Sequence, residues 1–366
     1  MSSADRQALY SGTEAPPEHL RLDIRALGDC LAQRIPGLGG DFTVEKFKGG
    51  QSNPTYKLTG RPANSVTAPL AVVLRRRPPG PLVPSAHAID REYRVMSAVE
   101  RAGYPVPHPW FYCDDASVIG SAFYIVGYCP GRVFWNAELA GVDRAERTAL
   151  YADMNARLAQ LHGCDIDALG LGDFGPRAGY VARNLARWSN VYRQSELMPI
   201  PDMDWLIDRL PALVPADERV CLVHGDYGLY NLVVADDAPR VAAVLDWEMA
   251  TLGDPFVDLA HHLRAWWDPP DPGGGATSLQ GHDLAALGIP SMADYVAAYC
   301  RHAGIAAPPH WRFYLGFAQF RYAAMIQGIL KRAALGTAAS RVVLHRQERV
   351  LEIAALARAT LRGPEP

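Results

Sequence analysis

The first third of the chain alternates between helix-like and strand-like patterns of hydrophobic residues. Residues 22–35 carry apolar side chains at helical spacing, and the glycine-rich stretch GLGG follows them. Short runs rich in Val, Thr and aromatic residues come next, as in an antiparallel meander, at residues 41–47, 55–60 and 69–75. A second helical pattern and two further strand-like runs follow at residues 86–103, 109–115 and 121–128, the last two joined by a turn-like DDASVIG. We therefore expect helix, three strands, helix and two strands.

The pattern changes after the CPG at residues 129–131, where helix-like segments dominate. They cover residues 146–163, 188–198, 202–214, 292–304 and a closing run from about 311 to 361. Three short apolar runs, VCLVHGD, NLVVAD and RVAAVLDWE, interrupt them and end in acidic residues. The glycine-rich and proline-rich stretch 269–278 is predicted to be a loop. These patterns predict an α+β protein with a small antiparallel-sheet lobe over residues 1–128, containing five strands, and a mainly helical lobe over residues 129–366.

Composition narrows the classes of partner. The chain has 366 residues, enough for one large two-lobed domain or two ordinary domains, and 36 Lys plus Arg balance 39 Asp plus Glu. This near-neutral charge does not favour nucleic-acid binding, so a small-molecule partner is expected. The six cysteines form no C-x-x-C pair, which argues against a zinc site and a disulfide framework. No export signal or membrane span is recognised, and a cytoplasmic location is expected.

The stretch CLVHGDYGLYNLVV carries the strongest candidate chemistry. Asp226 follows His224 and Gly225, and Asn231 lies five positions beyond the acid. Phosphoryl transfer to a hydroxyl needs a proton acceptor and metal ligands, and protein kinases hold an Asp and an Asn at this spacing in the catalytic loop. About 15 residues later, Asp246 in VLDWE ends an apolar run, where its carboxylate suits magnesium.

Together these motifs resemble the family of aminoglycoside phosphotransferases and choline kinase-like small-molecule kinases, over nearly the whole chain. The resemblance implies a protein kinase-like bilobal fold that binds MgATP between its lobes. It also implies that Asp226 is the catalytic base, that Asn231 and Asp246 are magnesium ligands, and that His224 braces the loop. Asp258, in GDPFVDLAHH, resembles the buried acid that ties this loop down. A helix start at Asp254 and Pro255 is the structural alternative for that stretch.

Two further segments resemble nucleotide-binding parts of the family. The turn in KFKGGQSNPTYKL resembles the one that covers the nucleotide, with backbone amides available to phosphates, at Gly49, Gly50, Gln51, Ser52 and Asn53. FYIVGYCPGR lies where two lobes would join, and the backbone of Gly127, Tyr128 and Cys129 is expected to read the adenine edge. Simple packing is the alternative for Tyr128 and Cys129.

The third strand departs from the family pattern. The family has a lysine there, paired with an acid on the next helix, whereas this chain has Arg75 in AVVLRRR and no lysine between Lys57 and Lys331. Arginine keeps the positive charge but is bulkier and forms a planar fork of donors. Glu92, in DREYRVM, is the expected partner of Arg75. A solvated strand end is the structural alternative.

The run from LRRRPPG to FYCDD resembles one subgroup, the kinase-like domain that some eukaryotic proteins join to an acyl-CoA dehydrogenase. In that subgroup an arginine on the third strand is normal, and the implied substrate is a hydroxyacyl-CoA. The alternatives are a pseudokinase that binds nucleotide without turnover, and an aminoglycoside phosphotransferase. A protein kinase is disfavoured because no APE-type segment follows Asp246, and a hydrolase because no G-x-S-x-G motif is present.

The acceptor pocket has only candidate residues. A CoA thioester would need arginines such as Arg183, Arg187 or Arg321, whereas a polycationic aminoglycoside would need acids. Five tryptophans of the helical part could line a pocket but are better explained as core residues: Trp188, Trp205, Trp266, Trp267 and Trp311.

Overall fold

The computed structural model describes residues 7, 9–36, 38, 41–48, 53–60, 69–78, 88–270, 278–335 and 347–363. Contacts along the chain form two compact units. The N-terminal unit comprises residues 2–135 and 230–249, and the C-terminal unit comprises residues 136–229 and 250–366. The predicted lobe boundary at residue 128 stays a prediction, but residues 230–249 group with the N-terminal part of the chain.

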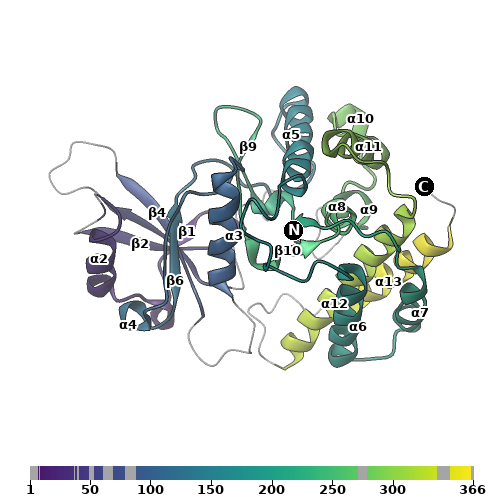
Figure 1. The fold of residues 1–366 in the computed structure, drawn as a ribbon, viewed down its shortest axis with the longest axis horizontal. Helices are drawn as coiled ribbons and strands as arrows, with labels where there is room; N and C mark the ends of the chain where they lie inside the picture. Colours follow the sequence, from purple (N-terminus) through teal and green to yellow (C-terminus); the bar gives the residue numbers. More distant parts are fainter. Residues whose placement is uncertain are drawn as a thin grey trace. The chain divides into compact units, whose positions relative to one another are not determined.

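The N-terminal unit contains a six-stranded antiparallel sheet (Figure 1). Its strand order is β1-β2-β3-β4-β6-β5. The strands are β1 (Thr13–Glu14), β2 (Phe42–Phe47), β3 (Thr55–Gly60), β4 (Leu70–Arg76), β5 (Pro109–Cys113) and β6 (Phe123–Gly127). Five of them match the predicted strands. The prediction of five was wrong by one because β1 has only two residues, too few to show an alternating pattern.

Helices cover both faces of this sheet. On one face, α2 (Ile24–Ala32) packs Leu27 and Leu31 onto a hydrophobic core that includes Val72 and Leu74 of β4. On the other face lies α3 (Ile89–Arg101), the predicted second helix, which contacts β5 and β6 (Figure 1). Because side chains alternate along a strand, Arg75 lies on the α3 face, opposite to Leu74. A short helix, α4 (Ala116–Ile119), replaces the predicted turn between β5 and β6.

A second, smaller sheet in the N-terminal unit is the hairpin of β8 (Leu232–Val234) and β9 (Val241–Val244). Short 3-10 helices flank it, η3 (Leu229–Asn231) before β8 and η4 (Trp247–Met249) after β9. The backbone amide of Val244 donates to the carbonyl of Pro105, 2.9 Å away. This bond attaches the hairpin to the segment that follows α3.

The C-terminal unit is mainly helical. Its principal helices are α5 (Arg144–His162), α6 (Tyr180–Ser195), α7 (Pro201–Arg209), α8 (Pro255–His262), α11 (Met292–Ala303), α12 (Trp311–Ala334) and α13 (Gln347–Arg362). Shorter elements are η1 (Glu18–Leu20) in the other unit and, here, η2 (Leu210–Leu213), α9 (Arg264–Trp267) and α10 (Leu284–Leu287). The strands β7 (Cys221–Val223) and β10 (Thr251–Gly253) pair antiparallel.

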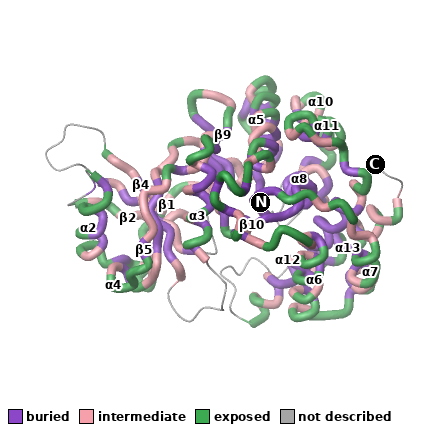
Figure 2. The backbone as a smooth tube through the Cα atoms, viewed as in Figure 1, coloured by how far each residue is buried: buried purple, intermediate pink, exposed green. Residues whose placement is uncertain are grey.

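Burial in the C-terminal unit centres on α8 and α12. Every residue of α8 is buried, and α12 packs against α6, α8 and α13 (Figure 2). Residues 336–346 of the predicted closing run, and most of the predicted loop 269–278, lie outside the described residues. All six cysteines carry free thiols. In the described part of the chain, no helix combines the length and the apolar character that crossing a membrane requires.

Candidate functional site

The predicted catalytic loop, residues 224–226 and called the catalytic loop below, leaves β7 in the C-terminal unit. Gly225 has φ +82°, a left-handed conformation that favours glycine, so the chain can turn sharply between His224 and Asp226. His224 is fully buried, and its Nδ1 accepts a hydrogen bond of 3.2 Å from the backbone amide of Asp226. The imidazole therefore holds the turn from inside, which is the geometry expected of a bracing residue.

Asp258 holds the backbone of the catalytic loop. Its carboxylate accepts hydrogen bonds from the amides of His224 (2.7 Å) and Gly225 (2.9 Å). His162 at the end of α5 adds a third contact, with Nε2 3.2 Å from Asp258 Oδ2. The alternative explanation for this stretch is also present, because Asp254 caps α8 by accepting from the amide of Phe256, with Pro255 in the first turn.

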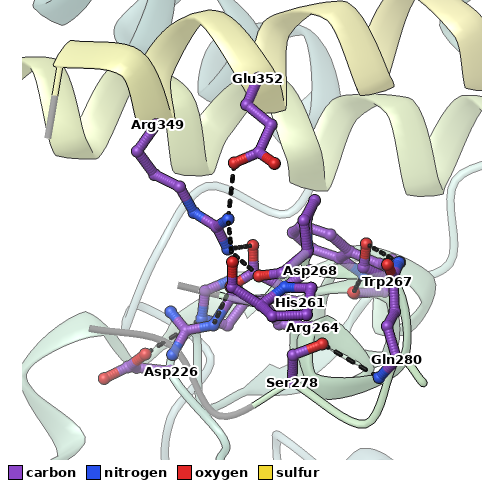
Figure 3. A network of polar contacts seen from close by, with 12 residues as sticks. Asp226, His261, Arg264, Trp267, Asp268, Ser278, Gln280, Arg349 and Glu352 are labelled. Carbon is purple, nitrogen blue, oxygen red and sulfur yellow. Dashed lines mark hydrogen bonds and ion pairs between the residues drawn. The ribbon is translucent and has the colours of Figure 1, made fainter. Parts of the chain in front are cut away.

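The carboxylate of Asp226 has a partner that the sequence did not reveal. Nε2 of His261 lies 3.0 Å from Asp226 Oδ1 (Figure 3). The Asp226 side chain remains 33% exposed. Arg321 of α12 donates from Nη2 to the carbonyl of Gly225 at 2.7 Å. Two helices, α8 and α12, thus contribute side chains to one loop, and His162 of α5 supports it through Asp258.

Burial and hydrogen bonding shift the pKa values around this loop in different directions. Burial alone would raise the pKa of Asp258, but the hydrogen bond and charge of His162, the charge of His224 and the amide of His224 hold it well below its usual range. Burial lowers the pKa of His261, and Arg321 lowers it further, while Asp226 opposes both. Asp258 is therefore an anion and His261 a neutral imidazole near pH 7.

In the N-terminal unit, strand pairing brings the two predicted metal ligands to the same end of a hairpin. Leu232 pairs with Val244, and the amide of Leu245 donates to the carbonyl of Asn231 at 2.8 Å. Asn231 directly precedes β8, and Asp246 follows the paired Leu245. Asp246 has φ +63°, an uncommon conformation for a residue with a side chain.

Arg75 lies among three carboxylates of the same unit, which we call the Arg75 cluster: Arg75, Glu92, Asp246 and Glu248. Arg75 Nε lies 3.0 Å from Glu92 Oε2, and Nη2 lies 2.7 Å from Asp246 Oδ1 and 3.3 Å from Glu248 Oε2. The predicted pairing with Glu92 is present, and Arg75 is not a solvated strand end because it is only 8% exposed. Burial would lower the pKa of Arg75, but Asp246 and Glu92 outweigh it and raise that pKa.

Glu92 is supported on both oxygens. Asn53 donates from Nδ2 to Oε1 at 3.1 Å, and the hydroxyl of Tyr124 donates to Oε2 at 3.0 Å. Burial raises the pKa of Glu92, with Arg75 opposing that change. The side chain of Asn53, predicted on the nucleotide-covering turn, is therefore buried and supports Glu92. Gly49, Gly50, Gln51 and Ser52 lie outside the described residues.

In residues 127–129, the segment predicted to read the adenine edge, two backbone amides donate to carbonyls of the protein. The amide of Gly127 donates to the carbonyl of His108 at 2.7 Å, and the amide of Tyr128 donates to the carbonyl of Ala71 at 3.2 Å. Lys57 Nζ lies 4.2 Å from the centre of the Tyr128 ring. While these bonds hold, the two amides do not face a base, so adenine reading by this segment would depend on its carbonyls and on Cys129.

The structure corrects the expectation for Arg321, agrees with it for two of the tryptophans, and adds His261. Arg321 is 4% exposed and bound to the catalytic loop, so it is unsuited to a CoA phosphate. Trp188 and Trp267 are buried core residues, as expected. His261 was missed, although a signal was present: in a helix that starts at Asp254 and Pro255, the alternative considered for this stretch, His261 lies three residues after Asp258 and hence on the same face.

The residues that would hold a divalent ion are Asn231 and Asp246. Magnesium prefers oxygen ligands and usually binds one or two protein groups together with phosphates and water. An amide oxygen and a carboxylate at one hairpin end fit that chemistry. Among the described residues, no group of three or more His, Cys, Asp or Glu side chains is arranged to hold a metal by itself. This donor set is therefore suited to an ion that arrives with phosphate ligands.

Comparison with known sequences places these features in a wider group. Residues 43–314 match the sequence model of the phosphotransferase enzyme family. Acyl-CoA dehydrogenase family member 10 of Mus musculus is 40% identical over 320 residues, which is 85% of this chain and 29% of that protein. The chain thus spans well under half the length of the curated relatives it matches.

The similar solved structures include further phosphotransferases. A putative aminoglycoside phosphotransferase from Ralstonia eutropha is 40% identical, with a TM-score of 0.83 over 94% of this chain and 100% of that chain. The aminoglycoside phosphotransferase APH(4)-Ia, solved with AMP-PNP and hygromycin B, is 16% identical, with a TM-score of 0.58 over 93% of this chain and all of that one. The second likeness concerns the fold alone. The expected kinase-like α+β fold and family resemblance are confirmed.

Proposed function

Since this chain belongs to the phosphotransferase enzyme family of small-molecule kinases, we propose that it transfers the γ-phosphoryl group of ATP to a hydroxyl group of a small molecule. The observation that carries the proposal is the catalytic loop. Its backbone is bound by Asp258, and its one partly exposed carboxylate, Asp226, is held by His261. A buried structural aspartate would have no reason to present an oxygen to solvent.

Asp226 acts as the general base. An aspartate orients the acceptor hydroxyl through a hydrogen bond and takes its proton as the bond to phosphorus forms. The Asp226 side chain is 33% exposed, so an acceptor hydroxyl can reach it from solvent. The hydrogen bonds that fix the loop beforehand reduce the motion needed to reach the reactive geometry.

Asn231 and Asp246 would hold magnesium, and Arg75 would supply positive charge to the phosphates. The ion would neutralise charge that develops on the transferred phosphoryl group. Arg75 currently binds Asp246 and Glu248, so a nucleotide phosphate would compete with these carboxylates for the guanidinium. Glu92, buried and bound by Asn53 and Tyr124, keeps Arg75 anchored during that exchange. The AMP-PNP complex of a protein with the same fold supports ATP as the donor.

We further propose hydroxyacyl-CoA as the acceptor class. The support is the relative named as an acyl-CoA dehydrogenase family member, which matches 85% of this chain. In the structure, Arg183 and Arg187 are exposed on α6 and four residues apart, hence on one helix face. Two exposed guanidinium groups suit the phosphates of CoA, whereas a polycationic aminoglycoside would be repelled by them.

An ADP-release screen tests this proposal. Purified chain with ATP and Mg²⁺ is offered hydroxyacyl-CoAs, the matching hydroxyacyl-pantetheines, aminoglycosides and choline-like alcohols. We expect turnover with hydroxyacyl-CoA and a higher KM for the pantetheine form, because the latter lacks the phosphates that Arg183 and Arg187 would bind. Equal KM values for the CoA and pantetheine forms would show that Arg183 and Arg187 do not bind the phosphates of CoA. If only an aminoglycoside were phosphorylated, the acceptor class would be aminoglycosides and not hydroxyacyl-CoAs.

A nucleotide-binding pseudokinase is the second candidate, and the Arg75 cluster favours it. An arginine that stays bound to Asp246 would block a magnesium ligand. In that case ATP would raise the melting temperature without phosphoryl transfer to any acceptor of the screen. Transfer of labelled γ-phosphate to any acceptor would exclude this candidate.

A further inference from the structure

We propose that His261 is a positioning residue for Asp226, donating from Nε2–H to Oδ1 as a neutral imidazole and so fixing the orientation of the carboxylate. This inference rests on the proposed function, in which Asp226 is the base. Nε2 of His261 and Oδ1 of Asp226 are 3.0 Å apart, a normal hydrogen-bond distance.

The position of His261 on α8 explains why it meets the loop. Asp258 and His261 are three residues apart, so they lie on the same face of the helix. Asp258 binds the backbone amides of His224 and Gly225, and His261 binds the next side chain, Asp226. One buried helix thus holds both the backbone of the loop and the carboxylate that the loop presents.

The surroundings of His261 select its protonation state. The charged groups that face it are Asp226 on the loop, Arg321 on α12 and Arg264 on α9. Burial lowers the pKa of His261, the two arginines lower it further, and Asp226 raises it by less. Nδ1 is buried and has no hydrogen-bond partner within the described residues. A second ring proton would therefore be an unsatisfied buried donor beside Arg321, which is costly.

A neutral donor suits a general base. The single hydrogen bond restricts rotation of the Asp226 carboxylate, yet it adds no positive charge that would compete for the proton to be accepted. An arginine or a protonated histidine in the same place would bind Asp226 more tightly and weaken it as a base. The expected contribution of His261 is to kcat, because it acts on the acceptor proton and not on the nucleotide.

His261→Leu and His261→Gln test this role by steady-state kinetics with the acceptor found in the screen. Since a catalytic group misplaced by about 1 Å costs about 100-fold in rate, we expect His261→Leu to lower kcat about 10- to 100-fold while KM for ATP changes little. Glutamine places an amide N–H near the position of Nε2, so His261→Gln should recover most of the lost kcat. Equal loss in both variants would indicate a packing role and overturn the proposal.

Gln327→Leu is the matched control for loss of a buried hydrogen bond. Gln327 is fully buried on α12 and donates to the carbonyl of Ser195 at 3.0 Å, with no contact to the catalytic loop. We expect it to lower the melting temperature while kcat stays within about two-fold of wild type. A control that lost as much kcat as His261→Leu would show that destabilisation explains both.

Ring ¹⁵N NMR of His261 separates failure of this inference from failure of the proposed function. We expect the neutral tautomer with its proton on Nε2 near pH 7, and a changed Nε2 shift in Asp226→Asn. A proton on Nδ1, or a doubly protonated ring, overturns the inference whatever the enzyme does. Wild-type protein without transfer to any acceptor overturns the proposed function, and with it the kinetic role of His261.

Discussion

The Arg75 cluster and the catalytic loop are held by different forces. In the Arg75 cluster, one guanidinium meets three carboxylates, and two of these, Asp246 and Glu248, are 25% and 29% exposed. In the catalytic loop, the contacts are hydrogen bonds, most of them to the backbone, from Asp258, Arg321 and His261, and these side chains are almost completely buried. Partly exposed ion pairs therefore organise the first region, and buried hydrogen bonds organise the second.

This difference has a functional meaning. Ion pairs that are partly exposed can exchange partners, because incoming phosphate or magnesium replaces one charge contact by another. A loop held by buried hydrogen bonds keeps its geometry before substrate arrives, which is the arrangement that lowers the reorganisation cost of catalysis. The Arg75 cluster is thus suited to respond to ligands, and the catalytic loop is suited to stay the same.

The largest expected effect concerns the base itself. Asp226→Asn keeps the size of the side chain but removes the proton acceptor, so kcat should fall about 10²- to 10⁴-fold. ADP binding, measured by calorimetry, should stay close to that of wild type, because the substitution does not touch the Arg75 cluster. Full activity in this variant would show that Asp226 is not the general base.

The next effect concerns the stability of the loop. Asp258→Asn replaces a buried anion that accepts from two amides, so the free energy of unfolding should fall by about 2–4 kcal/mol. Because the pKa of Asp258 is held below its usual range in the folded state, its contribution is present above pH of about 4 and is lost as the pH falls below that value.

Denaturant titration of wild type and Asp258→Asn at several pH values measures that contribution. The difference between the two proteins should shrink on acidification below pH of about 4. Asp237→Asn, at a side chain that is 75% exposed, is the control and should leave stability nearly unchanged. A constant difference across the acid range would contradict the proposed anionic role.

A smaller effect is expected from the Arg75 cluster. Arg75→Gln removes the positive charge near the phosphates, and KM for ATP should rise about 10-fold, a change typical of one charged contact. Arg75→Lys keeps the charge but loses the fork that contacts three carboxylates, so its KM should be intermediate. If both variants bound ATP as wild type does, the role of Arg75 would be limited to its ion pairs with Glu92 and Asp246. The Arg75 cluster would then not respond to nucleotide, and the proposed difference from the catalytic loop would be wrong.

Some features could be predicted because their signals are local. The alternation in β2, β3 and β4 and the helical spacing of α3 depend on neighbouring residues, and the structure confirms them. The spacing of Asp226 and Asn231 is likewise visible in the sequence. Strand β1 and helix α4 escaped prediction because two and four residues carry too little periodicity to distinguish them from loops.

Arg321 and His261 show what local signals leave out. Arg321 looked like a surface arginine for CoA, yet it is buried against the carbonyl of Gly225, 96 residues away. His261 is separated from Asp226 by 35 residues, and only the packing of α8 against the loop brings them together. Likewise, the amides of Gly127 and Tyr128 are used by carbonyls of other segments.

The sequence by itself determined five of the six strands of the main sheet, helices α2 and α3, the order of the predicted catalytic acids and the replacement of lysine by Arg75. These features are set by the residue types and their spacing along the chain, which folding does not change. Only the tertiary structure decided which side chains hold Asp226 and which carboxylates bind Arg75. Such contacts join segments that are far apart in sequence, and they form because buried charges and hydrogen-bonding groups must find partners once the chain is folded.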